Sequence, residues 1–234
     1  MAIDACCHSC AHEKDSPCLS KVPLFSKLSS SELADLQPLV RTRVYSKGEF
    51  IFQEGEGSDS LFIVNSGTVK ISKLSGEGKE KIIRFLFTGD FFGQFALLQE
   101  KMHDSHAIVL DDAMVCSIRR QDFLPIMEAN AKMAHAFLLA MSERLHETEE
   151  WMGTVTLLEA EQRLAKLLLL FFGKNGHNMT FELPVPKKEL AALIATTPET
   201  FSRKLASLEE QGIIAVSSKS ITIRDLESLQ MLAG

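Results

Sequence analysis

The spacing of hydrophobic residues changes twice along the chain. Between residues 22 and 119, short runs of Val, Ile, Leu and Phe are broken roughly every eight to twelve residues by clusters of Gly, Asp or Ser. Such clusters tolerate tight turns, and the pattern is typical of short antiparallel strands. We therefore predict a β-barrel of the jelly-roll type. Strand-like runs lie at residues 60–64 and 67–72, on either side of an expected turn, and at residues 81–87.

After Arg120 the hydrophobic period lengthens towards 3.5 residues, and Gly and Pro almost vanish between Ile126 and Met152. This change predicts one long helix. Spacings of three and four place six residues on one stripe of it, which favours pairing with a second helix in a homodimer. The stripe comprises Leu138, Met141, Leu145, Thr148, Met152 and Val155.

The alternative for this stripe is packing on the barrel. A helix of about thirty residues is about 45 Å long and would extend beyond a small barrel, so we favour self-association. Thr148 is the polar member of the stripe and should weaken the pairing.

The last third of the chain begins with a helical pattern at residues 160–172, ended by Gly173. Two shorter helical patterns follow, at residues 186–194 and 198–211, separated by a three-residue turn. Thr197 precedes Pro198 as a helix N-cap should. Two short helices joined in this way indicate a helix-turn-helix. Hydrophobic runs at residues 213–216 and 221–223 then predict a hairpin, which would be the wing of a winged helix.

These patterns together predict an α+β protein of four parts. A cysteine-rich arm occupies residues 1–20 and a β-barrel domain residues 21–122. A dimerisation helix follows at residues 123–156, and a winged helix-turn-helix at residues 157–234.

The second short helix carries side chains of the kind that read DNA bases in a major groove. Glu199, Ser202 and Arg203 share one face of it, because their spacings are three and four residues. Arginine binds guanine through two hydrogen bonds, and a carboxylate accepts from the amino group of cytosine. Thr196, Thr197 and Lys204 are candidates for phosphate contacts. The alternative is an ordinary solvated helix face, but the turn and the wing favour binding to double-stranded DNA.

Composition limits the functional class. The 234 residues are 45% hydrophobic and 24% charged, as in an ordinary globular protein. The net charge of −6 argues against non-specific coating of nucleic acid, although it permits a local DNA-reading element. The longest apolar run, residues 164–172, contains Lys166 and is too short to cross a membrane. No apolar signal segment precedes the first cysteines, so we expect a cytoplasmic protein.

Four of the five cysteines lie close together near the start of the chain, at Cys6, Cys7, Cys10 and Cys18. Thiolates at this density suit a soft metal or an iron–sulfur cluster. A disulfide framework would instead distribute its cysteines through the fold. The fifth, Cys116, lies among Met, Val and Ile and by itself suggests a buried core thiol.

Three motifs carry a resemblance that covers nearly the whole chain. They are Gly89-Asp-Phe-Phe-Gly93, Pro198-Glu-Thr-Phe-Ser-Arg203 and Ser220-Ile-Thr-Ile. With them the chain resembles the Crp/Fnr family of bacterial transcription regulators. The Glu-x-x-Ser-Arg form is similar to the FNR branch. That resemblance implies a homodimer that reads a TTGAT-N4-ATCAA palindrome and works with RNA polymerase.

The resemblance also indicates which ligand the barrel is expected to detect. In the cyclic-nucleotide branch, a Glu follows the second Gly of the cassette and an Arg-Ser pair grips the cyclic phosphate. Here Gln94 and the sequence Asp104-Ser-His-Ala107 stand at those positions. Cyclic AMP is therefore not the expected ligand, because a cyclic phosphate needs a cationic partner.

The FNR branch instead implies a 4Fe-4S cluster that senses oxygen, held by three cysteines of the arm and one on a barrel strand. The matching set is Cys7, Cys10, Cys18 and Cys116, with Cys6 in reserve. The gap between Cys10 and Cys18 is longer than in that branch. Three alternatives remain: zinc bound by Cys7, Cys10, Cys18 and His8 or His12, a redox disulfide, or haem that senses nitric oxide through His8 or His12.

The sequence gives less support to two other functional classes, an enzyme and a structural adaptor. A cupin-like metal oxygenase needs two or three His and a carboxylate on neighbouring strands, whereas the barrel offers only His103 and His106 in one region. We therefore do not expect an enzyme. A structural adaptor acting through the long helix would not need the winged helix.

Overall fold

The computed structural model describes residues 22, 25, 28–57, 59–99 and 101–234. Contacts divide the chain into two units, residues 1–144 and 145–234, each considered by itself below. The four-part division expected from the sequence stays a prediction. No helix within the described part of the chain is long and apolar enough to cross a membrane.

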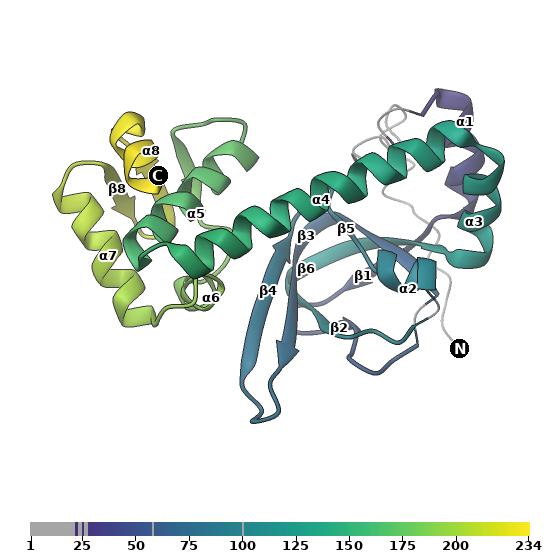
Figure 1. Ribbon diagram of the computed structural model, residues 1–234, viewed down its shortest axis with the longest axis horizontal. Helices are drawn as coiled ribbons and strands as arrows, with labels where there is room; N and C mark the ends of the chain where they lie inside the picture. Colours follow the sequence, from purple (N-terminus) through teal and green to yellow (C-terminus); the bar gives the residue numbers. More distant parts are fainter. Residues whose placement is uncertain (1–21, 23–24, 26–27, 58, 100) are drawn as a thin grey trace. The chain divides into compact units, whose positions relative to one another are not determined.

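The first unit is built on one antiparallel sheet (Figure 1). Its hydrogen-bonded order is β1-β6-β3-β4, with β2 paired to β6 and β5 paired to β3. The jelly-roll architecture is confirmed, but the pairing of the described strands is open and does not close into a barrel. The strands are β1 (Arg41–Tyr45), β2 (Phe50–Phe52), β3 (Ser60–Leu74), β4 (Glu80–Leu86), β5 (Phe91–Phe92) and β6 (His106–Arg119).

Strand β3 continues without interruption through the position at which the sequence predicts a turn. The two expected runs belong to this one strand, and its register against β6 shifts between Val64 and Val69. Gly67 has φ 85°, and a Cβ there would lie 2.6 Å from the carbonyl oxygen of Asp112. The predicted turn is wrong because a glycine at positive φ here forms a β-bulge, which bends a strand without reversing it.

The sheet packs into two hydrophobic clusters, one on each face. Ala113 and Val115 of β6 belong to a cluster made of strand residues, which we call the sheet cluster. Cys116 and Ile118 belong to a second cluster that also contains helix residues, which we call the helix-side cluster. The division follows from the alternation of side chains along a strand. The sheet cluster comprises Tyr45, Phe52, Val64, Val69, Ile71, Leu86, Phe92, Ala107, Val109, Ala113 and Val115. The helix-side cluster comprises Val22, Phe25, Leu28, Leu33, Leu36, Leu61, Ile63, Phe91, Cys116, Ile118, Phe123, Met133, Phe137 and Ala140.

The segment expected to form one long helix is divided at Asn130. Its backbone is extended there, with φ −120° and ψ 96°, and its Oδ1 accepts hydrogen bonds from the N–H groups of Lys132 and Met133. Asn130 therefore caps the following helix, as short polar side chains do when they compete with the helical backbone. The helices of this unit are α1 (Ser30–Leu36), the 3-10 turn η3 (Gln37–Leu39), α2 (Gln94–Gln99) and α3 (Arg120–Ala129); α4 (Ala131–Leu157) begins here and continues into the second unit.

The second unit combines a helix-turn-helix with a small sheet. The predicted hairpin is confirmed, with Ile214 opposite Ile223 and Ser217 opposite Ser220. A third strand and a final helix, which the sequence pattern does not predict, complete the unit. Its elements are α5 (Ala160–Lys174), β7 (Thr180–Glu182), α6 (Lys187–Leu193), α7 (Pro198–Glu210), β8 (Ile214–Ser217), β9 (Ser220–Ile223) and α8 (Leu226–Ala233).

Candidate DNA-reading face and sensor region

Helix α7 begins where the sequence predicts. Thr197 is extended, with φ −86° and ψ 154°, and its Oγ1 accepts a hydrogen bond from the N–H of Thr200 at 3.2 Å. Pro198 occupies the first helical position, where its missing N–H costs no hydrogen bond. The start of the helix is thus set by two adjacent residues.

One face of α7 is buried and another faces solvent. Phe201, Leu205 and Leu208 pack into the core of the unit. Glu199, Ser202 and Arg203 are all exposed on the first two turns, together on one side of the helix. A hydrogen bond with its own backbone N–H, and then one with the side chain of Thr197, lowers the pKa of Glu199 below its usual value. This face therefore presents an ionised acceptor next to a permanent cation.

The three phosphate candidates are placed differently from one another. Thr196 is half-buried, whereas Thr197 is exposed and uses its hydroxyl for the N-cap and for a hydrogen bond to Thr200. The Nζ of Lys204 lies 2.7 Å from Oε2 of Glu161 in α5. The structure thus groups the three base-reading candidates and gives Lys204 a partner within the protein.

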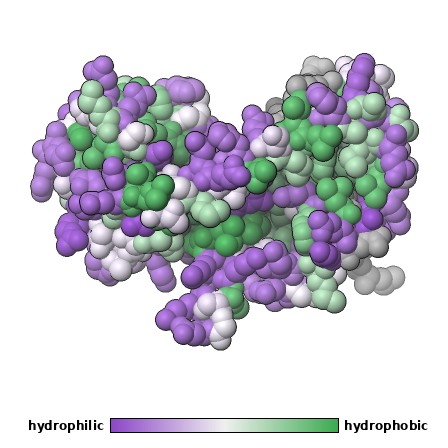
Figure 2. All heavy atoms as spheres, in the orientation of Figure 1, coloured by the Kyte–Doolittle hydropathy of each residue, from purple (hydrophilic) through white to green (hydrophobic). Residues whose placement is uncertain are grey.

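Along α4, the predicted dimer stripe is largely exposed. The exposed fractions of Leu138, Leu145 and Met152 are 66%, 60% and 59%. Thr148 is exposed as well, Val155 is half-buried, and Met141 packs against the helix-side cluster. Figure 2 shows hydrophobic residues on the surface in view, in patches between hydrophilic ones. Large apolar side chains repeated along one helix face are typical of an interface.

Cys116 is 1% exposed and faces the helix-side cluster. Its Sγ lies 3.5 Å from Oγ1 of Thr42 on the neighbouring strand β1. Val22 and Phe25, which follow the cysteine-rich arm in the sequence, pack in the same cluster. Val22 and Phe25 therefore lie on the same side of the sheet as the thiol.

The other proposed ligands, Cys7, Cys10 and Cys18, lie outside the described residues, as do Cys6, His8 and His12. Within the described ranges, no group of three or more His, Cys, Asp or Glu is arranged to hold a metal ion. Any thiolate site that includes Cys116 must therefore draw its other ligands from the arm.

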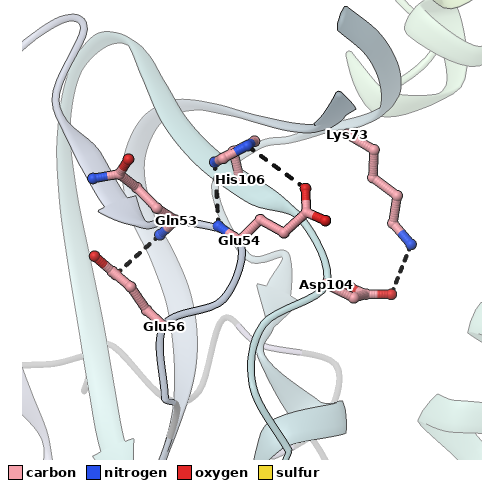
Figure 3. Close-up of polar contacts among 6 residues, drawn as sticks. All are labelled: Gln53, Glu54, Glu56, Lys73, Asp104 and His106. Carbon is pink, nitrogen blue, oxygen red and sulfur yellow. Dashed lines mark hydrogen bonds and ion pairs between the residues drawn. The ribbon is translucent and has the colours of Figure 1, made fainter. Parts of the chain in front are cut away.

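Polar residues at one edge of the sheet occupy the region where the resemblance places a cyclic phosphate (Figure 3). The Nζ of Lys73 lies 2.7 Å from Oδ2 of Asp104. This hydrogen bond is the main cause that lowers the pKa of Asp104 below its usual value. The Nδ1 of His106 accepts a hydrogen bond from the N–H of Glu54 at 3.2 Å. An ionised carboxylate thus stands where a cyclic phosphate would need a cation.

His103 is the buried neighbour of this group, and its N–H donates a hydrogen bond to the carbonyl oxygen of Glu56 at 2.9 Å. Its ring stacks on Phe52, with the centroids 3.4 Å apart and the planes within 1°. Burial lowers the pKa of His103 below its usual value, so the neutral form is favoured. The two histidines considered for an enzymatic metal site are therefore engaged in packing and hydrogen bonding.

Sequence reasoning missed an ion pair between a buried lysine and an exposed glutamate in this sheet. Lys70 of β3 is 6% exposed, and its Nζ lies 2.9 Å from Oε1 of Glu80 on β4. The only sequence signal is a lysine between Val69 and Ile71 in a buried strand. A lone charge in such a run predicts either an edge or a buried partner, and the sequence does not distinguish the two.

Comparisons with known proteins agree with this geometry. Residues 42–130 match the cyclic nucleotide-binding domain family, and residues 162–232 match the Crp-like helix-turn-helix domain family. The cyclic AMP receptor protein of Thermus thermophilus is 28% identical over 211 residues, which cover 90% of this chain and 96% of that protein. The anaerobic regulatory protein of Haemophilus influenzae is 29% identical over 212 residues, which cover 88% of this chain and 82% of that protein.

A solved structure shows the same fold. FixK2 from Bradyrhizobium japonicum superposes with a TM-score of 0.77 at 24% identity, and the match covers 83% of this chain and 98% of that one. The two family matches lie in the expected order, with the sheet domain first and the helix-turn-helix domain last. The chain therefore belongs to the Crp/Fnr family of DNA-binding transcription regulators.

Proposed function

We propose that this regulator reads a TTGAT-N4-ATCAA palindrome as a homodimer and senses oxygen through a cysteine-ligated 4Fe-4S cluster. The observation that carries the DNA-reading part is the exposed side of α7, where Glu199, Ser202 and Arg203 lie together. The buried side of the same helix fixes their direction. In the major groove, Arg203 would bind guanine and Glu199 would accept from a cytosine amino group.

A palindrome requires two copies of this helix. The exposed apolar stripe of α4 supports a two-fold pairing of the chain, since unpaired leucines and methionines gain free energy on burial. A two-fold dimer would place two α7 helices in successive major grooves, one helical turn of DNA apart. Bound there, the dimer would act on transcription together with RNA polymerase.

Binding to DNA is tested by titrating a fluorescent TTGAT-N4-ATCAA duplex with anaerobically purified protein. Scrambled and single-half-site duplexes of equal length are the controls. We expect the palindrome to bind at least about a thousandfold more tightly than scrambled DNA. Equal affinity for the palindrome and the scrambled duplex would contradict this part of the proposal.

The placement of Cys116 supports the sensor. Three residues separate Cys18 from Val22, and the four residue steps between them span at most about 14 Å in an extended chain. Val22, the first described residue after the arm, packs in the same cluster as Cys116 and so lies on the side of the sheet that carries the thiol. Cys7, Cys10 and Cys18 with Cys116 form the four-thiolate donor set that an iron–sulfur cluster needs.

When bound, the cluster supplies a centre that reacts with oxygen. The protein's own residues explain how its state would reach the DNA-binding unit. Cys116 shares the helix-side cluster with Met133, Phe137 and Ala140 of α4. An arm fixed at Cys116 would hold Val22 and Phe25 against this cluster and so favour one position of α4. Release of the arm would weaken that packing and shift the population away from the DNA-binding dimer.

Cyclic AMP is the second candidate, because one relative bears that name and the sheet domain matches the cyclic nucleotide-binding family. The residues argue against it. Asp104 is ionised and paired with Lys73, and Gln94 stands where the cyclic-nucleotide branch has a carboxylate. An anionic phosphate placed next to Asp104 would be repelled.

The sensor is tested by measuring iron and acid-labile sulfide in protein purified under strict anaerobiosis. We expect roughly four irons per subunit, a broad charge-transfer absorption, and loss of both in Cys116→Ala, Cys7→Ala, Cys10→Ala and Cys18→Ala. Cys6→Ala is the matched control and should retain the cluster. A colourless protein with zinc and no iron would overturn the iron–sulfur proposal, and a haem spectrum would favour the nitric oxide alternative.

A further inference from the structure

Lys204 points away from the base-reading side of α7. It follows Arg203 by one residue, and successive residues of an α-helix differ in direction by about 100°. Its side chain is 32% exposed, and that of its partner Glu161 is 22% exposed. The distance of 2.7 Å between Nζ and Oε2 is that of a short charge-assisted hydrogen bond. To contact a DNA phosphate, Lys204 would have to leave a largely enclosed carboxylate.

Glu161 lies in the first turn of α5, where several elements of the second unit meet. Two residues later, Nη1 of Arg163 lies 3.4 Å from the carbonyl oxygen of Ala195 in the helix-turn-helix turn. The same Nη1 lies 3.5 Å from the carbonyl oxygen of Val155, near the end of α4. The start of α5 therefore contacts the turn before α7, the body of α7 and the last turns of α4.

The opposite end of α7 has an anchor as well. Oε1 of Glu209 accepts a hydrogen bond from the N–H of Val216 in β8, at 2.8 Å. This bond attaches the end of the helix to the wing. Directional polar contacts at two points restrict rotation of α7 about its own axis, because a hydrogen bond weakens steeply when its angle departs from linear.

We propose that Lys204 is a positioning residue rather than a phosphate contact: its ion pair with Glu161 sets the rotation and tilt of α7 on α5. The inference rests on the proposed DNA-reading function of α7. Because α5 follows α4 after a short connection, the same contact makes the direction of the reading face depend on the end of α4. Loss of this ion pair should lower discrimination between DNA sequences more than it lowers the general affinity for DNA.

The test compares Lys204→Met, Glu161→Gln and the exchanged pair Lys204→Glu with Glu161→Lys. Lys81→Met, which removes one exposed cation from β4, is the charge-matched control. Affinities for palindromic and scrambled duplexes are measured over a series of salt concentrations. We expect each single variant to lose about tenfold in the ratio of the two affinities, and the exchanged pair to recover most of it.

The salt dependence of DNA binding distinguishes a positioning role of Lys204 from a phosphate contact. A lost phosphate contact reduces the slope of log affinity against log salt by about one and weakens binding to every sequence equally. That result for Lys204→Met, with Glu161→Gln unchanged, would overturn the proposal. An unaltered salt slope with reduced discrimination would support it. Wild-type protein that fails to prefer the palindrome would instead refute the proposed function.

A measurement without DNA keeps the inference testable in that case. Amide hydrogen exchange of the DNA-free protein should be faster in α7 for Lys204→Met and for Glu161→Gln than for the wild type, while β3 is unchanged. Equal protection of α7 in all three proteins would overturn the positioning role.

Discussion

The side-chain amide of Asn130 donates a hydrogen bond to Oε1 of Glu32, 2.5 Å away, and so joins α1 to the start of α4. Both residues also serve their own helices. Asn130 caps α4, and Oε2 of Glu32 accepts from the N–H of Ser29 at 2.7 Å in the capping box of α1. One hydrogen bond therefore links two helix starts that are far apart in the sequence.

This arrangement predicts a dependence of stability on acid. A hydrogen bond from the backbone N–H of Ser29, followed by that from Asn130, lowers the pKa of Glu32 to about 2. Since the ordinary pKa in the unfolded chain is near 4.5, the contribution of Glu32 is complete above pH 4.5 and is lost as the pH falls towards 2. The free energies of unfolding of the wild type and Glu32→Gln, measured with urea, should differ most near pH 7.

Other carboxylates titrate in the same range, so the difference between the two proteins is the useful quantity. Asp35→Asn, on the same helix, is the matched control for the loss of one carboxylate. A difference in the free energy of unfolding between wild type and Glu32→Gln that stays constant from pH 7 to pH 2.5 would refute the prediction.

His103 predicts a second pH effect at higher pH. Because burial lowers its pKa in the folded protein, the unfolded chain binds more protons below pH 6.5. His103 therefore leaves the free energy of unfolding unaffected above pH 6.5. Below pH 6.5 it lowers this free energy, by up to about 1.4 kcal/mol for each pH unit between the unfolded and folded pKa values. Thermal unfolding of His103→Gln should lack this slope.

The control for His103 is His135→Gln, which changes an exposed histidine of α4. Both variants are measured between pH 5 and pH 7. If His103→Gln retains the slope of the wild type, the slope arises from another group.

Replacement of Arg203 by Ala should weaken binding to the palindrome by about 1 to 3 kcal/mol per half-site. The expected weakening comes from loss of the proposed bidentate contact between Arg203 and guanine. Fluorescence anisotropy with TTGAT and TTAAT half-sites measures the effect. The wild type should distinguish the two duplexes and Arg203→Ala should not, whereas equal weakening on both would make Arg203 a phosphate contact.

Pairing along α4 is tested by Leu145→Asp. Two carboxylates facing each other in an apolar interface should weaken the dimer at least about a hundredfold, as buried unpaired charges do. Analytical ultracentrifugation measures the dissociation constant. Glu143 is exposed and lies on the far side of α4 from the stripe, so Glu143→Ala should leave the dimer intact.

Trp151 provides an independent signal for the same equilibrium. It is half-buried and adjoins Met152 of the stripe. Its fluorescence should change over the concentration range in which the protein dimerises. An unchanged spectrum across that range would place the interface elsewhere.

Local signals predicted some parts of this fold well. Helix α7 starts at Pro198, as expected, because the N-cap of Thr197 and the proline act over neighbouring residues. Other features depend on residues distant in sequence. Gly67 suggests a turn from the sequence alone, and only its pairing with β6 makes it a bulge. The break at Asn130 was missed because a single asparagine among helix-forming residues is a weak signal.

The candidate site was predictable to a similar extent. The face with Glu199 and Arg203 follows from helical spacing, whereas the partner of Lys204 lies 43 residues away and has no periodic signature. Burial of Cys116 was expected from its apolar neighbours, but its direction depends on strand pairing. The cysteines of the arm lie outside the described residues, so their arrangement stays a prediction.

Val115 and Cys116 are adjacent on β6, yet one packs in the sheet cluster and the other in the helix-side cluster. Substitutions that reshape one side of this sheet therefore leave the surroundings of the other nearly unchanged. The residues on the two sides of this strand can therefore vary separately in sequence, although they alternate along one segment of the chain.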